Sequence, residues 1–281
     1  MPISLMSPAL KDLAYASLSP AQKLDLYYPA GNGPFPLVVN VHGGAFMMGD
    51  KADPHKQPAL AQLVASGYAV ASVNYRLSGE AKFPAQIQDV KTAVRWLRAH
   101  AGEYRLSSEN IGAWGDSAGG HLVALLGTSC GVADLEGANL GCADQSSCVQ
   151  AVVDWFGPID FLQMDRQFDG TGCPQDHDEP DSPESRLIGA PIQERPDLAG
   201  AANPITYITP HAPPFLIQHG TADCLIPPQQ SQLLYEALCT AAGKEAMTLT
   251  VLPGAGHGGN PFIDPANMRQ VIGFFDRYLK S

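Results

Sequence analysis

Residues 110–119 read Asn-Ile-Gly-Ala-Trp-Gly-Asp-Ser-Ala-Gly, a G-x-S-x-G motif preceded by an apolar run. The apolar run before Gly115 predicts a buried strand, and the small residues after Ser117 predict a helix packed closely on a sheet. A serine at such a sharp strand-to-helix turn has a strained backbone, so the positions two residues away need glycine for steric clearance. Gly115 and Gly119 provide that clearance and leave the Ser117 hydroxyl exposed. Alone, the motif is also compatible with an ordinary Gly/Ser-rich turn.

Short apolar runs alternate with amphipathic helical patterns along the rest of the chain. Buried strands are expected at 37–41, 69–73, 110–114, 149–156, 215–218 and 247–252. Helical spacing appears at 84–97, 121–126, 233–238 and 271–278. This alternation predicts an α/β fold: a mostly parallel, doubly wound sheet of about eight strands with helices on both faces. Two further segments predict a leading antiparallel hairpin at the sheet edge, 13–18 and 24–28.

One segment, 157–214, interrupts this alternation within a single domain spanning 1–281. It is rich in proline, glycine and aspartate and is too long for an ordinary connection. We expect a small inserted cap over the active face, with a short helix near 182–188; the alternative is a solvated surface excursion. The Asp-His-Asp cluster at 176–178 is expected to be a hydrated acidic loop rather than a metal site.

Composition restricts the partners that the chain can bind. Twenty-eight acidic and 17 basic residues give a net charge of −11, and no run of lysine or arginine occurs. Nucleic acids and anionic membranes both require clustered positive charge, so neither is expected as a partner. No apolar stretch approaches the roughly 20 residues of a membrane span, and residues 1–12 do not read as a signal peptide. The chain as written suits a soluble cytoplasmic protein, or a secreted or periplasmic one if a signal has been removed, and a homodimer is left open.

The six cysteines fit no metal-binding or redox spacing. Three of them, Cys142, Cys148 and Cys173, lie in loops rich in glycine and aspartate. A Cys142–Cys148 disulfide is one interpretation, and reduced thiols without a structural role are the other.

If Ser117 is a nucleophile, it needs a base, an acid that orients the base, and hydrogen-bond donors for an oxyanion. Asp223 follows the expected strand 215–218 by a few residues, and His257 lies in a glycine-rich loop after the strand 247–252. The carboxyl ends of parallel strands meet at one edge of the sheet, so we predict Asp223 as the acid and His257 as the base. His219 is better interpreted as a packed, hydrogen-bonded structural residue, and Asp264 is placed too late to be the acid.

The oxyanion donors are predicted from the segment that follows the strand 37–41. Residues 42–46 read His-Gly-Gly-Ala-Phe, and consecutive glycines leave backbone N–H groups free to point into a site. The predicted donors are the N–H groups of Gly43, Gly44 and Ala118.

These motifs together carry a family resemblance over nearly the whole chain. HGGAF at 42–46 and GDSAGG at 115–120 resemble the hormone-sensitive-lipase-like esterases of the α/β-hydrolase superfamily. Three longer stretches resemble the bacterial bifunctional feruloyl and acetylxylan esterases: NYRLS at 74–78, FPAQIQDVKTAVRWLR at 83–98 and VVDWFGPIDF at 152–161. Ala45 stands where many relatives carry a third glycine, which is tolerable if only the N–H groups of Gly43 and Gly44 are used.

The resemblance implies the α/β-hydrolase fold and a serine carboxylesterase that works through an acyl-enzyme, without metal or cofactor. Its expected substrates are short-chain or aromatic esters, including acetyl or feruloyl esters linked to plant cell-wall polysaccharide. Candidate substrate contacts are Phe46, Asp116, Trp155 and Ile226. One alternative is an amide-cleaving relative such as a kynurenine formamidase. The other is a ligand-binding protein without catalysis, which the presence of His257 disfavours.

Overall fold

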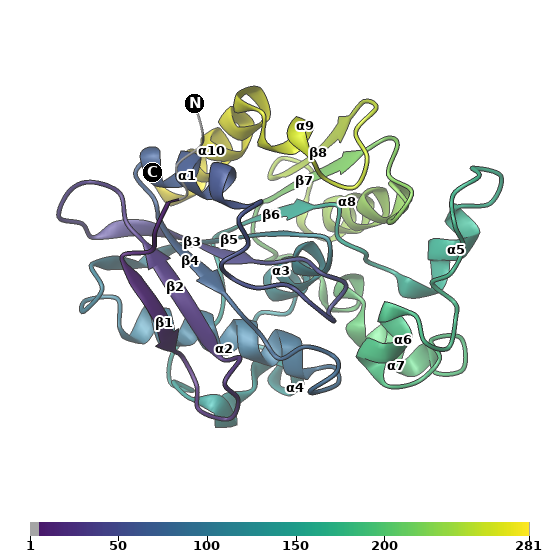
Figure 1. The fold of residues 1–281 in the computed structure, drawn as a ribbon, viewed down its shortest axis with the longest axis horizontal. Helices are drawn as coiled ribbons and strands as arrows, with labels where there is room; N and C mark the ends of the chain where they lie inside the picture. The colour runs from purple at the N-terminus through teal and green to yellow at the C-terminus, as the bar shows by residue number, and fades with distance from the viewer. Residues whose placement is uncertain (1–5, 281) are drawn as a thin grey trace.

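The computed structural model describes residues 6–280, and its centre is one eight-stranded sheet (Figure 1). The strand order is β1-β2-β4-β3-β5-β6-β7-β8. Strand β2 is antiparallel to both of its neighbours, and the pairs from β4 to β8 are all parallel. The bounds are β1 (Leu10–Ala14), β2 (Lys23–Tyr27), β3 (Phe35–Val41), β4 (Ala69–Val73), β5 (Leu106–Asp116), β6 (Ala151–Trp155), β7 (Phe215–Gly220) and β8 (Met247–Leu252). The predicted mostly parallel α/β sheet is confirmed.

Helices cover both faces of the sheet because successive strand residues point to opposite sides. In β3, Leu37 and Val39 join one core cluster, whereas Val38 joins the other. The first cluster lies under α2 (Ala85–Ala99), α3 (Ala118–Thr128) and α8 (Gln229–Ala242). The second lies under α1 (Gln57–Ala65) and α10 (Pro265–Leu279), which Figure 1 shows together above the sheet. The sequence patterns did not predict α1. Shorter elements are α4 (Ala133–Glu136), η1 (Ala138–Leu140) and α9 (Asn260–Ile263).

The first hairpin strand differs from its prediction. We expected it at 13–18, but β1 ends at Ala14. The reason is a turn in which the Gln22 side-chain oxygen accepts hydrogen bonds from the Leu18 and Ser19 N–H groups, at 2.8 and 3.0 Å. Leu18 is 65% exposed at this turn, so its side chain contributes little to the core.

The segment 157–214 holds a series of short helices: η2 (Phe161–Gln163), α5 (Met164–Gln167), α6 (Pro183–Ile188), α7 (Pro196–Ala202) and η3 (Pro204–Tyr207). Helix α6 begins where its sequence suggested, because the Ser182 side chain accepts a hydrogen bond from the Ser185 N–H. Figure 1 shows α5, α6 and α7 to the right of the sheet. The hydrated-loop expectation is wrong for His177, which is only 5% exposed and is hydrogen-bonded inside this segment.

The cysteine predictions are also corrected. Disulfides join Cys130 to Cys148 and Cys173 to Cys224, while Cys142 and Cys239 are free. Cys148 is therefore bonded to the cysteine that follows α3 rather than to Cys142.

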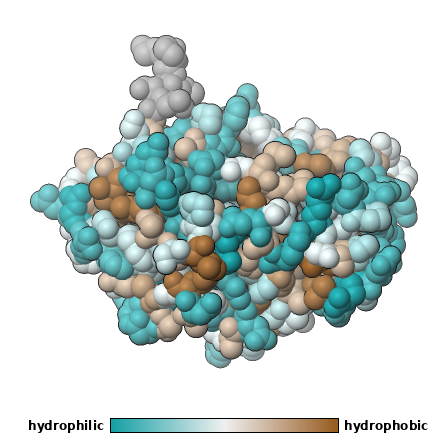
Figure 2. Space-filling model, turned by 60° about the horizontal axis from the view of Figure 1, so that its bottom comes forward, coloured by the Kyte–Doolittle hydropathy of each residue, from teal (hydrophilic) through white to brown (hydrophobic). Residues whose placement is uncertain are grey.

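The surface is mainly hydrophilic on the face shown in Figure 2, where hydrophobic side chains form small separate patches. Within residues 6–280, none of the helices combines the length and the hydropathy that a membrane crossing requires.

Candidate active site

Ser117 lies at the turn between β5 and α3 with φ 53° and ψ −125°, a conformation that a residue with a side chain rarely adopts. Its N–H donates a hydrogen bond to the Trp155 carbonyl at 2.9 Å. A Cβ atom at Gly115 would overlap the backbone of Gly119, and one at Gly119 would overlap the Val41 carbonyl oxygen. The glycines therefore allow α3 to pass close to the sheet and hold the serine turn in place.

Asp223 and His257 follow β7 and β8, and the fold brings both to Ser117. The His257 Nδ1–H donates to Asp223 Oδ2 at 2.7 Å, and His257 Nε2 accepts from the Ser117 hydroxyl at 2.9 Å. The Asp223 side chain is fully buried, whereas the His257 side chain is 20% exposed. These distances allow a proton to pass from serine to histidine.

The surroundings of Asp223 keep its carboxylate ionised. Burial alone would raise its pKa, but hydrogen bonds from His219 and His257 hold the pKa well below its usual range. The other oxygen, Oδ1, accepts from the N–H groups of Leu225 and Ile226 at 2.8 and 3.0 Å. His219 is buried, as its sequence context suggested, with Nε2 3.2 Å from Asp223 Oδ2 and Nδ1 2.7 Å from Ser231 Oγ. An ionised acid is what a histidine base needs as its orienting partner.

The loop 42–46 lies directly beside the serine turn. A Cβ atom at Gly43 would come within 3.2 Å of Ser117 Cβ. Hydrogen bonds fix the loop: His42 Nδ1–H donates to the Gly43 carbonyl at 2.7 Å, and the Tyr75 hydroxyl donates to the His42 carbonyl at 3.0 Å. Within the described residues, the N–H groups of Gly43, Gly44 and Ala118 donate no hydrogen bond. They are therefore available to a bound oxygen atom.

A cavity of about 530 Å³, the serine cavity, opens in front of Ser117 and His257. Asp116 lines it and forms an ion pair with Lys56, a residue that the sequence did not single out. The side chains of Met48 and Leu225 also line it and are 61% and 53% exposed. No motif or periodic pattern in the sequence indicates that Lys56 lies at the site, because this residue belongs to the loop before α1.

A smaller cavity of about 290 Å³ shares part of this wall. Both cavities are lined by Lys56, Phe156, Gly258 and Gly259. The smaller one adds the aromatic residues Trp155 and Phe262, so a candidate substrate contact, Trp155, lies there rather than beside Ser117.

The structure does not bring the other two candidate contacts to either cavity. Phe46 is 1% exposed and packs edge-on against His121 and Phe161, with ring centroids 5.3 and 6.2 Å away. Ile226 is 4% exposed, and its carbonyl faces His219 Nε2 at 3.0 Å. Both side chains are part of the core beneath the site.

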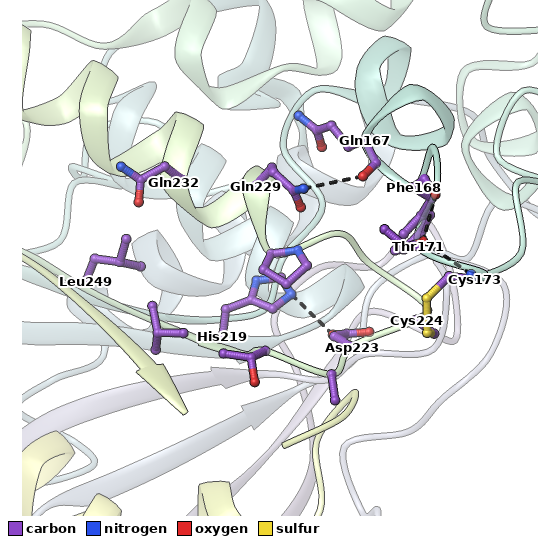
Figure 3. A pocket seen from close by; sticks show the side chains of 14 residues that line it. Gln167, Phe168, Thr171, Cys173, His219, Asp223, Cys224, Gln229, Gln232 and Leu249 are labelled. Carbon is purple, nitrogen blue, oxygen red and sulfur yellow. Dashed lines mark hydrogen bonds and ion pairs between the residues drawn. A yellow bond between two sulfur atoms is a disulfide. The ribbon is translucent and has the colours of Figure 1, made fainter. Parts of the chain in front are cut away.

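A third cavity, of about 540 Å³, also reaches the Asp223 loop (Figure 3). Ser117 does not line it, and its lining residues include His219, Asp223, Cys224, Gln167, Gln229 and Leu249. In residues 6–280 no group of three or more histidine, cysteine, aspartate or glutamate side chains is arranged to hold a metal ion.

The chain is similar in sequence to one protein family and to several proteins named as esterases. Residues 24–238 match the BD-FAE family. The chain is 33% identical to the esterase LipC of Mycobacterium tuberculosis over 241 residues, covering 85% of this chain and 57% of LipC. It is 31% identical to the esterase LipQ of the same organism, covering 79% of this chain and 50% of LipQ. The chain thus spans about half the length of these curated relatives.

Two solved structures extend the similarity to three dimensions. A truncated form of a carbohydrate esterase from gut microbiota superposes with a TM-score of 0.88 at 33% identity, covering 99% of this chain and 98% of the other. A bifunctional GH43-CE protein of Bacteroides eggerthii superposes with a TM-score of 0.85 at 38% identity, covering 95% of this chain and 35% of the other.

Proposed function

Because the chain belongs to the BD-FAE family of α/β-hydrolase esterases, we propose that it cleaves carboxylic esters with Ser117 as nucleophile, His257 as base and Asp223 as orienting acid. The observation that carries this proposal is the continuous hydrogen-bonded series from Ser117 Oγ through His257 to the buried carboxylate of Asp223.

The chemistry follows from the positions of these groups. Ser117 Oγ attacks the ester carbonyl while its proton moves to His257 Nε2, and Asp223 stabilises the resulting imidazolium. The negative oxygen of the tetrahedral intermediate accepts hydrogen bonds from the free N–H groups of Gly43, Gly44 and Ala118. Each such donor typically contributes about 10²–10³ in turnover. His257 then returns the proton to the leaving alcohol, and water attacks the acyl-enzyme with the same histidine as base.

The proposed substrates are acetyl or feruloyl esters linked to plant cell-wall polysaccharide. Membership of the BD-FAE family and the similarity to a carbohydrate esterase support an ester attached to a sugar. The smaller cavity supports an aromatic acyl group, since Trp155, Phe156 and Phe262 line it and Phe156 also lines the cavity in front of Ser117. We propose further that the segment 157–214 is a cap on the substrate side.

Two measurements test this function. Ser117→Ala should abolish hydrolysis of a short-chain nitrophenyl ester, and retained turnover would contradict the mechanism. Parallel assays on methyl ferulate, acetylated xylan and an N-formyl amide then decide the substrate, and preference for the amide would exclude the esterase assignment.

A further inference from the structure

One side of the loop that carries Asp223 faces the third cavity. Asp223 and Cys224 line this cavity together with Phe168 and Cys173 of the segment 157–214 (Figure 3). Side-chain packing is what normally fixes a buried loop. Here, links from the segment 157–214 add to the hydrogen bonds that His219 and His257 make with Asp223.

Two links of this kind are present, and one of them reaches the active-site wall. The disulfide Cys173–Cys224 binds the segment to the residue after the acid. His177 Nε2 lies 2.9 Å from the Leu225 carbonyl oxygen. The N–H of the same residue, Leu225, donates to Asp223 Oδ1 at 2.8 Å, and its side chain lines the serine cavity. Through its contact with Leu225 alone, His177 is therefore connected both to Asp223 and to the wall of the cavity in front of Ser117.

The other side of the His177 ring is also occupied by an acceptor. Its Nδ1 lies 3.3 Å from Glu184 Oε2, and the two residues are 5% and 3% exposed. A neutral imidazole has one N–H, so only an imidazolium donates to both Glu184 and Leu225. Burial alone would lower the pKa of His177, but Glu184, the Leu225 carbonyl and the nearby Asp165 raise it above its ordinary value. Asp165 Oδ1 accepts the backbone N–H of His177 at 3.0 Å, so a second carboxylate lies close to this residue.

We propose that His177 is a positioning residue of the active site, which holds the Leu225 peptide and through it the orientation of Asp223 and the wall of the serine cavity. The inference rests on the proposed esterase function and adds a role for the segment 157–214. A small displacement of the acid would misalign His257, and misplacements near 1 Å can cost about 10²-fold in rate.

A matched pair of substitutions separates positioning from simple packing. In His177→Gln the amide nitrogen occupies the place of Nε2 and keeps the hydrogen bond to Leu225. In His177→Asn the amide nitrogen occupies the place of Nδ1 and reaches only Glu184. Both variants lose the ring and the imidazolium charge, so their melting temperatures should fall by similar amounts.

The expected result is a difference in kcat rather than in stability. His177→Asn should lower kcat by about 10- to 100-fold, whereas His177→Gln should stay within about threefold of the wild type. Equal activities of the two variants, whether both high or both low, would overturn the proposal.

A second readout does not depend on any substrate. The proton between His257 Nδ1 and Asp223 should give a low-field proton NMR signal that persists in His177→Gln and shifts or disappears in His177→Asn. An unchanged signal in His177→Asn would refute the positioning role even if the wild type hydrolysed no ester. Absence of ester hydrolysis by the wild type would by contrast refute the proposed function alone.

Discussion

The most demanding prediction concerns Asp154, a fully buried carboxyl group on β6 beneath the serine turn. Its Oδ1 accepts the Gly157 N–H at 3.0 Å, and its Oδ2 has no hydrogen-bond partner in the described part of the chain. Burial raises the pKa of Asp154 from 3.8 to about 7, against the smaller lowering effects of the Gly157 N–H and His219. The nearby Asp116 contributes a small part of this rise.

The sign of the effect on stability follows from this raised pKa. Below pH 3.8 the carboxyl is neutral in both the folded and the unfolded state, so its contribution to stability is fully present. As the pH rises from 3.8 to about 7, the unfolded state releases its proton first and stability is lost. At about 1.4 kcal/mol per pH unit, the full loss is about 4 kcal/mol, reached above pH 7.

Asp154→Asn removes this titration and keeps the acceptor for the Gly157 N–H. The unfolding free energy of the variant should therefore rise relative to the wild type by about 3–4 kcal/mol between pH 4 and pH 8. Urea unfolding followed by tryptophan fluorescence suits the assay, since Trp114 and Trp155 are buried. Asp181→Asn is the control, because that side chain is 80% exposed and its replacement should leave the pH dependence unchanged. If the wild-type and Asp154→Asn curves ran parallel across this range, the reasoning about burial would be refuted.

Two further changes test the serine turn and the acid. Gly119→Ala should lower the free energy of unfolding by about 1–3 kcal/mol or more, because the added methyl group overlaps the Val41 carbonyl. The control in thermal unfolding is Gly102→Ala, since no atom lies within 4 Å of the added methyl group there. Equal melting temperatures of the two variants would contradict the steric argument. Asp223→Asn should lower kcat on a nitrophenyl ester by up to about 10⁴-fold, the loss for the same change in a serine protease triad, because the amide favours the wrong histidine tautomer. Turnover within tenfold of the wild type would show that Asp223 is not the orienting acid.

The strands and the serine site could be predicted because each has a local cause. The run Ala69–Val73 is apolar except for one serine and is buried at every position, as expected for a strand covered on both faces. The glycines around Ser117 reflect a backbone that leaves no space for side chains. The proximity of Asp223 and His257 to Ser117 could be predicted because residues that follow parallel strands gather at one sheet edge.

Other features depend on tertiary contacts that a single sequence does not encode locally. The helix Gln57–Ala65 was missed because its polar and apolar residues are poorly separated into two faces, although alanine and leucine favour a helix. The pairing of Cys173 with Cys224, 51 residues apart, is decided by the path of the segment 157–214. Phe46 was expected in the substrate cavity, but its φ of 60° places the ring against His121 in the core.

The distribution of the site along the chain also affects how the protein is made. Ser117 and His257 are 140 residues apart, and the base follows the last strand of the sheet. At the usual translation rate of about 5–20 residues per second, Ser117 is synthesised roughly 7–28 s before His257, its proposed base. During that interval the serine has no proton acceptor from β8, so a nascent or prematurely terminated chain carries an unactivated hydroxyl. On the proposed mechanism, the Ser117 hydroxyl is therefore activated only after β8 and the loop that follows it have been synthesised.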